Sequence, residues 1–413
     1  MAADTPLARR LGMTDAVAIG LGSMVGAGIF ASFAPAAAAA GSGLLIGLAI
    51  AAAVAFCNAT SSAQLAARYP TSGGAYVYGR ERLGEWPGFL AGWMFVVGKT
   101  ASCAAMALTF AAYAAPPALQ KPIAVAAVLA LAAVNYFGVT RTAGLTRVII
   151  AIVLLVLATI VVLGVTGGKS TEVDLGGSLF SEGWYGILQS GGLLFFAFAG
   201  YARLATMGEE VRRPSRTIPR AIVVALTIVL GLYAVVATTS LTVLGPASLA
   251  GSSAPLRDVV TAAGHAWAAP IVQAGAAIAS LGALLALIAG VGRTSLAMAR
   301  NGDLPVFLAA VQPKYRVPHH AEIVLALIVV GVVLLVDVRG AIGFSSFGVL
   351  LYYLVANVSA FTQPRSERRF PRALQVVGAV GCLVLVATLP VASILTGVAV
   401  ALAGVVYRAL TVR

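Results

Sequence analysis

Twelve apolar segments run through the chain, separated by short polar loops. An α-helix needs about 20 apolar residues to cross the ~30 Å hydrocarbon core of a bilayer, and most of these segments reach that length. Hydrophobic residues make up 60% of the 413 and charged residues only 10%, far from the composition of soluble proteins. We therefore predict an all-α integral membrane protein with about twelve transmembrane helices, over residues 14–36, 43–67, 86–114, 122–139, 147–166, 185–208, 220–244, 268–299, 321–337, 341–362, 373–390 and 391–410.

The distribution of Lys and Arg predicts how these spans are oriented. With the amino terminus inside, the cytoplasmic loops hold 21 of the 27 basic residues, the outer loops hold 4, and Lys99 and Arg203 lie inside spans. Cytoplasmic loops of membrane proteins carry such an excess of basic residues. We expect a multi-pass protein of the plasma (inner) membrane, with both termini cytoplasmic and residues 1–413 forming a single transmembrane domain.

The charge distribution and the few Cys and His residues exclude several functional classes. The net charge of +13 reflects topology, so we expect no nucleic-acid partner. Three Cys and three His, far apart or in loops, form no metal-ligand pattern, so we expect neither a metal nor a cofactor. No paired acids or nucleophile with an adjacent base lies within the spans, so we predict that the chain is not an enzyme.

The first span is rich in glycine between Gly20 and Gly28. Each glycine costs a helix about 1 kcal/mol relative to alanine. One interpretation is close helix packing through Gly22 and Gly26, which have the Gly-xxx-Gly spacing. The other is an unwound stretch whose backbone lines a cavity, because irregular backbone is tolerated at that depth only there.

A second interrupted span favours the unwound interpretation. Residues 185–208 contain Gly191-Gly192 and Gly200-Tyr201, and this span holds the corresponding place in a second half of five helices, crossing in the opposite direction. Paired interruptions in inverted halves are typical of secondary transporters whose site lies at mid-membrane. Free N–H groups at such breaks suit a carboxylate, and free carbonyls suit an ammonium group or a cation.

Four motifs resemble those of the amino acid–polyamine–organocation (APC) permeases. They are the glycine-rich stretch from Ser23 to Phe30, the run from Phe195 through Glu210 to Pro219, the loop from Arg293 to Pro305, and Arg68-Tyr-Pro-Thr-Ser-Gly-Gly-Ala-Tyr76. The resemblance implies a LeuT-type inverted repeat with residues 1–166 and 185–362 as its halves, followed by two helices over 373–410. It also implies alternating access and a small-molecule substrate, an amino acid or an amine.

The resemblance further implies where the substrate binds. Its carboxylate would meet the backbone around Gly26, Ala27 and Gly28, beside Ser23. Its amino group would meet carbonyls near Met24, Phe196 and Ala199. Phe198 and Tyr201 would shape or gate the pocket.

Two cations inside the spans bear on mechanism. Lys99 lies 13 residues past Trp86, which is roughly 20 Å along a helix, and it is either a structural lysine bonded to helix ends or a proton-coupling group. Related permeases often carry a lysine in the fifth span, where this chain has none, and we interpret Lys99 as its substitute. Two intramembrane cations favour a neutral amino acid as substrate over a dibasic one, and they leave an anionic one open.

Other possibilities stay open. Arg203 either pairs with Glu209 or Glu210 near the cytoplasm or forms an inner gate. A sodium-coupled amino acid or amine symporter is an alternative to proton coupling or exchange, with a cation site between Gly20 and Ser280. An ion channel is an alternative of another class. The oligomeric state is not predicted.

Overall fold

A computed structural model describes residues 11–69, 73–138, 143–167, 178–201, 204 and 211–411. Within these ranges the regular elements are all helices, as the apolar segments predict. The main α-helices are α1 Met13–Met24, α2 Ala27–Ala31, α3 Phe33–Ala40, α4 Leu44–Arg68, α5 Ala75–Leu83, α6 Glu85–Ala114, α7 Gln120–Tyr136, α8 Ala143–Thr166, α9 Gly183–Phe198, α11 Pro214–Gly251, α12 Pro255–Ala262, α13 Ala269–Arg300, α14 His319–Leu335, α15 Val338–Phe361, α16 Arg372–Thr388 and α17 Val391–Thr411.

Nine segments of the described chain are long and apolar enough to cross a membrane. Two shorter apolar helices, α14 and α16, lie where two further spans were predicted, and α9 covers the first part of the predicted span 185–208. Large apolar side chains are exposed on the outer surfaces of these helices, including Leu335 at 86% and Leu155 at 69%. Such surfaces are compatible with hydrocarbon and not with water, so the chain is a multi-pass membrane protein.

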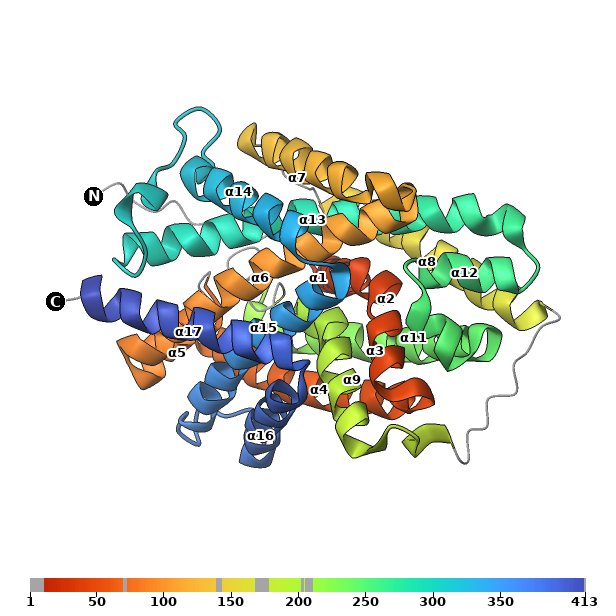
Figure 1. The fold of residues 1–413 in the computed structure, drawn as a ribbon. Helices are drawn as coiled ribbons and strands as arrows, with labels where there is room; N and C mark the ends of the chain where they lie inside the picture. The colour runs from red at the N-terminus through yellow and green to blue at the C-terminus, as the bar shows by residue number, and fades with distance from the viewer. Residues whose placement is uncertain are drawn as a thin grey trace.

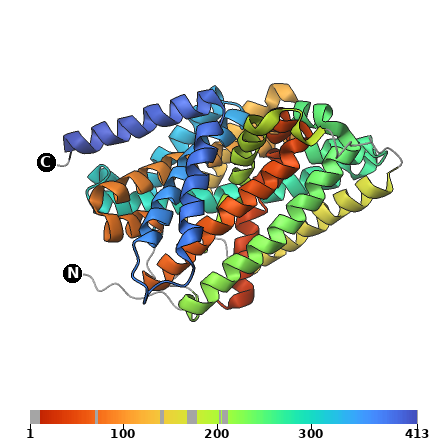
Figure 2. The ribbon, with the colours of Figure 1, turned by 90° about the horizontal axis from the view of Figure 1, so that it is seen from below.

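The helices form one bundle with two distinct ends (Figure 1). The short helix α5 and the carboxyl end of α17 lie at one end, and α12 lies at the other. We call these the α5 end and the α12 end. The core of the bundle is the contact of α6 with α13 and α15, with α4 packed against both α9 and α11. Figure 2 shows α4 and α11 running side by side.

Two predicted boundaries differ from the structure for physical reasons. The span predicted over 220–244 is part of α11, which begins at Pro214 and continues to Gly251 across a kink at Gly245, whose φ is +71°. Proline suits the first turn of a helix, so α11 begins among charged residues that an apolar window does not include. The span predicted over 185–208 also has a shorter helix, because α9 ends at Phe198, just before the interruption predicted at Gly200-Tyr201.

Candidate functional site

The first span is interrupted where its glycines predict. α1 ends at Met24, and Val25 and Gly26 have non-helical dihedrals, with φ/ψ of −80°/52° and −101°/−144°. α2 then begins at Ala27. The chain therefore leaves the carboxyl end of α1 and the amino end of α2 facing a break inside the bundle.

The sixth span is interrupted at a corresponding point. α9 ends at Phe198 and a single turn of 3₁₀-helix, Ala199–Tyr201, follows it. The N–H of Ala199 donates to the carbonyls of Phe195 and Phe196. The backbone thus departs from the α-helix at the predicted Gly200-Tyr201 interruption, whereas Gly191-Gly192 lie within α9.

Glycines bring the two breaks into direct contact. A Cβ on Gly200 would lie 2.0 Å from the carbonyl oxygen of Ser23, and one on Gly28 would lie 2.7 Å from the Cα of Ala197. Only glycine permits this approach of two backbones. The predicted residues of both spans therefore form one buried unit.

The Gly-xxx-Gly interpretation requires Gly22 and Gly26 to contact the same neighbouring helix, and they do not. Gly22 faces Thr146 of α8, whereas Gly26 faces Ala283 of α13. The glycines both permit the break and let four helices, α8, α9, α11 and α13, approach the first span. Packing and unwinding are therefore combined in this segment.

Protein donors already engage the carbonyls that were predicted to bind an amino group. Lys99, 6% exposed on α6, donates from Nζ to the carbonyl of Ala199 over 3.3 Å. Tyr233 of α11 donates from Oη to the carbonyl of Met24 over 2.7 Å, with the Ala197 carbonyl 3.1 Å away. An ammonium group that binds these carbonyls must compete with Lys99 and Tyr233.

The structural interpretation has Lys99 bonded to a helix end, and its amino group does lie at the end of α9. Proton coupling through Lys99 stays a prediction. Tyr233 was missed, because a lone tyrosine within an apolar run is more often a core residue than a ligand to a break. Aromatic rings complete the surroundings. Phe198 packs on Tyr233 with centroids 5.1 Å apart, Tyr201 stacks on Tyr353 at 4.9 Å, and Phe196 is buried.

Tyr113 closes the bundle at the α12 end. Its Oη donates to the carbonyl of Phe30 in α2 over 2.9 Å and accepts from the N–H of Leu256 in α12 over 3.1 Å. The rings of Phe30 and Tyr113 meet edge to face at 5.7 Å. One hydroxyl therefore joins the first span, α6 and the connector α12. We call these contacts the Tyr113 latch.

The amino end of the first span is held at the other side of the break. Leu11 forms a β-bridge with Val211, and the N–H of Arg212 donates to the Leu11 carbonyl over 2.9 Å. Asp15 of α1 also forms an ion pair with Arg147 of α8. Contacts therefore hold the first span on both sides of the break, and we call this arrangement of the described residues the occluded state.

Two of the four motifs meet in a charged cluster at the α5 end. Asp303, 2% exposed, accepts hydrogen bonds from Tyr76 Oη at 2.6 Å, from Arg80 Nη1 at 2.7 Å and from Arg408. Arg408 also lies 3.2 Å from Glu85. Burial and the Asp303 hydrogen bond raise the pKa of Tyr76 to about 12, so its hydroxyl stays a donor. We call these five residues the Asp303 cluster.

The remaining predicted residues are not gathered at the break. Gly20 faces Leu204 and Ala225, and Ser280 is buried on α13 with no hydrogen-bond partner for its hydroxyl among the described residues. The cation site between Gly20 and Ser280 stays a prediction. Arg203, Glu209 and Glu210 lie outside the described residues.

Comparisons with known proteins agree with this architecture. A family model described as "Amino acid permease" matches residues 11–410. An uncharacterized transporter of Mycobacterium tuberculosis is 58% identical, covering 97% of this chain and 90% of its own. The branched-chain amino acid permease BcaP of Bacillus subtilis is 25% identical over 90% of this chain and 84% of its own. Human cationic amino acid transporter 4 is 30% identical over 85% of this chain and 59% of its own.

Proposed function

Because the chain belongs to the amino acid permeases of the APC superfamily, we propose that it carries a neutral amino acid across the plasma membrane by alternating access. Family and relatives make it a transporter and not an enzyme. The single observation that carries the finer proposal is the hydrogen bond from Lys99 to the Ala199 carbonyl, because it places a cation at the break between the spans.

The packing of the helices supports a five-plus-five inverted repeat. If the first span, α4, α6, α7 and α8 correspond to α9, α11, α13, α14 and α15, then contacts must occur in matched pairs. The contacts do occur in matched pairs. The contact of α1 with α11 matches that of α9 with α4, and the contact of α1 with α8 matches that of α9 with α15. The contact of α6 with α15 matches that of α13 with α8, and the contact of α6 with α14 matches that of α13 with α7. The connectors α5 and α12 follow the same rule, since α5 packs on α6 and α15, and α12 packs on α13 and α8.

Basic loop residues support an orientation with the α5 end in the cytoplasm. Arg80, Arg82, Arg300 and Arg316 all belong to α5 or to the loop at the end of α13, whereas the α12 connector carries Arg257 beside Asp258. By the positive-inside rule the α5 end is the cytoplasmic one. The Tyr113 latch is then an outer closure.

The substrate's two charged groups have separate places in this proposal. The carboxylate meets the backbone of Gly26, Ala27 and Gly28, as in the family, and the ammonium group meets the Ala199 carbonyl. Lys99 occupies that carbonyl when the site is empty, so substrate and Lys99 compete. A dibasic substrate would add a second cation beside Lys99, which like-charge repulsion disfavours.

Competition at one carbonyl also provides a coupling mechanism. A protonated Lys99 that gives up its acceptor to the substrate's ammonium group faces a like charge at close range. Release of the Lys99 proton relieves that repulsion. Substrate binding is therefore expected to release a proton, and substrate affinity to rise with pH.

Uptake by the purified protein in proteoliposomes tests this mechanism. We expect uptake of radiolabelled neutral amino acids to respond to pH, and a Lys99→Met variant to lose that response. Lys121→Met is the matched control, because Lys121 donates to the Leu334 carbonyl at the end of α14, away from the break. An active Lys99→Met protein with an unchanged pH profile contradicts proton coupling through Lys99.

The same preparation separates the alternatives. Loss of uptake when sodium is replaced by choline favours the sodium-coupled symporter. Its candidate ligand is the hydroxyl of buried Ser280, which has no hydrogen-bond partner in the part of the chain that the structure describes. Flux without saturation or counterflow favours a channel. A thermal-shift screen of amino acids identifies the substrate, because a ligand that binds only the folded state stabilises it by RT ln(1 + [L]/Kd).

A further inference from the structure

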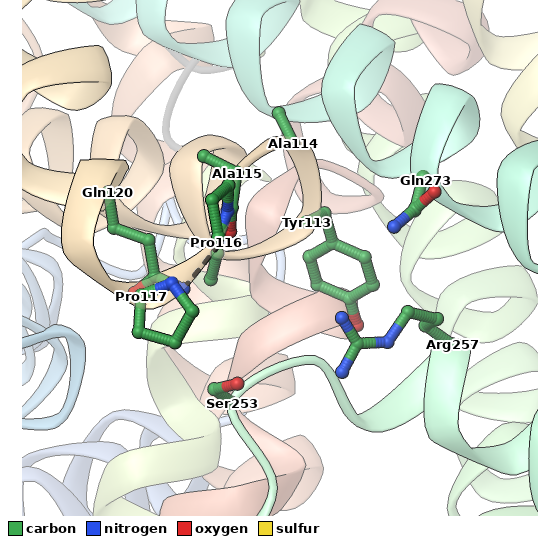
Figure 3. Close-up of a pocket in the computed structure, with 10 residues that line it drawn as sticks. Tyr113, Ala114, Ala115, Pro116, Pro117, Gln120, Ser253, Arg257 and Gln273 are labelled. Atoms are coloured by element: carbon green, nitrogen blue, oxygen red, sulfur yellow. Dashed lines mark hydrogen bonds between the residues drawn. The ribbon is translucent and has the colours of Figure 1, made fainter.

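A cavity of about 320 Å³ lies at the α12 end, apart from the residues of the break. It is lined by the carboxyl end of α6, by Gln120 of α7, by Ser253 and Arg257 of the α12 connector and by Gln273 of α13 (Figure 3). Cavities of a few hundred Å³ are the size that small-molecule sites have.

One side of this cavity carries the guanidinium group of Arg257, which forms an ion pair with Asp258. Figure 3 shows the guanidinium group of Arg257 pointing into it, with the amide of Gln273 and the hydroxyl of Ser253 nearby. Arg257 contacts Asp258 through Nε at 3.0 Å and Nη2 at 2.8 Å, and this pair leaves Nη1 for another acceptor. Arginine is well suited to bind a carboxylate, with amide and hydroxyl donors adding hydrogen bonds.

The other side is negatively polarised. α6 ends at Ala114, and residues Ala112–Ala115 line the cavity. The last carbonyls of a helix have no partner within it and carry the negative end of the helix dipole. One of the carbonyls here, that of the cap residue Ala115, accepts from Gln120 Nε2 over 3.4 Å. A cation bound there is stabilised by these carbonyls.

We propose that this cavity is an outer binding site for a zwitterionic α-amino acid, with its carboxylate on Arg257 and its ammonium group toward the carboxyl end of α6. The inference rests on the proposed function, because the outer side is defined by that orientation and the ligand class by that family. It adds a site that the substrate occupies before it reaches the break.

The position of the cavity links this site to the outer closure. Tyr113 lines the cavity and at the same time joins Phe30 of α2 to Leu256 of α12. Arg257 is the residue directly after Leu256. A bound amino acid therefore lies against the Tyr113 latch, through which it must pass to reach the break.

Thiol protection tests the site directly. Ser253 is exposed in the cavity wall, and Cys57, Cys103 and Cys382 are all buried, so Ser253→Cys supplies the reactive thiol. Intact cells are labelled with a membrane-impermeant maleimide, with or without a mixture of the common L-amino acids lacking cysteine. We expect the mixture to slow labelling at least fivefold, and the corresponding methyl esters, which lack the carboxylate, to have little effect.

Variants identify the residue responsible. Arg257→Ala in the Ser253→Cys background should abolish protection, and Arg257→Lys should retain part of it. Arg339→Ala is the matched control, because Arg339 donates to the Ala250 carbonyl and does not line the cavity. In uptake assays Arg257→Ala should raise the external KM with little change in Vmax, and leave the KM measured from the cytoplasmic side unchanged.

Three results overturn the proposal: protection that persists in Arg257→Ala, equal protection by the methyl esters, or no protection by the mixture. Each of these results is interpreted together with amino acid uptake measured in the same cells. If uptake of amino acids persists, only the outer site is refuted. If uptake is absent as well, the proposed function itself fails.

Discussion

Replacing Tyr113 by phenylalanine should shift the transporter toward its outward-open state. The substitution keeps the ring and removes the hydroxyl that donates to the Phe30 carbonyl and accepts from the Leu256 N–H. In the occluded state both backbone groups are then buried without this partner, whereas opening exposes them to water. A buried group that loses its partner costs about 1–3 kcal/mol. With partial compensation we take about 2 kcal/mol for the pair, which corresponds to a shift of about 30-fold.

A buried thiol reports this shift. Ser32 lies between α2 and α3, is 0% exposed, and its hydroxyl has no hydrogen-bond partner among the described residues, so cysteine should fit there. Labelling of Ser32→Cys by an impermeant maleimide then requires opening at the α12 end. The labelling rate is proportional to the fraction of outward-open molecules when reclosing is faster than labelling. Tyr113→Phe should raise that rate about 30-fold, the factor that about 2 kcal/mol represents.

A second tyrosine provides the matched control. Tyr76→Phe removes a hydroxyl of similar burial from the Asp303 cluster at the opposite end. It should leave labelling of Ser32→Cys unchanged. Equal rates in the Tyr113→Phe and unsubstituted backgrounds, or an equal increase in Tyr76→Phe, would refute the assignment of Tyr113 as an outer latch.

Two further substitutions test the break and the charged cluster. Gly200→Ala should abolish uptake, because its Cβ would meet the Ser23 carbonyl, whereas Gly231→Ala has open space and should leave uptake and thermal stability unchanged. Asp303→Asn should lower the free energy of unfolding by about 3 kcal/mol, the lower end of the usual cost of removing one partner of a buried ion pair. Buried Arg408 then keeps only the exposed Glu85 as counter-ion, so Arg408→Leu combined with Asp303→Asn should lose less than the sum of the single variants in a thermal-unfolding cycle.

An all-helical membrane protein with many spans, and the first break, could be predicted because both depend on local sequence. Hydropathy over about 20 residues identifies a helix in a bilayer, and the glycines from Gly20 to Gly28 indicate where that helix is weak. The ends of helices were less accurate, as α11 shows, because its polar first turn carries no hydropathy signal.

Contacts between distant residues could not be predicted in the same way. Lys99 and Ala199 were each singled out, yet their hydrogen bond depends on how α6 packs against the end of α9. Tyr113 and Tyr233 stand alone in apolar runs, where a tyrosine is more often a core residue than a hydrogen-bond donor to a break or a closure. Only the fold shows which backbone groups their hydroxyls reach.

The Asp303 cluster has a consequence for how the chain is assembled. Its members come from α5, the start of α6, the loop after α13 and the last turn of α17. During synthesis the amino-terminal helices are made first, and Asp303 precedes Arg408 by 105 residues. Until α17 is made, the buried carboxylate lacks one of its two arginine partners. Completion of this cluster therefore requires α17 to pack on helices made earlier, and nascent chains stalled before Arg408 should be recognised as immature by cellular proteases.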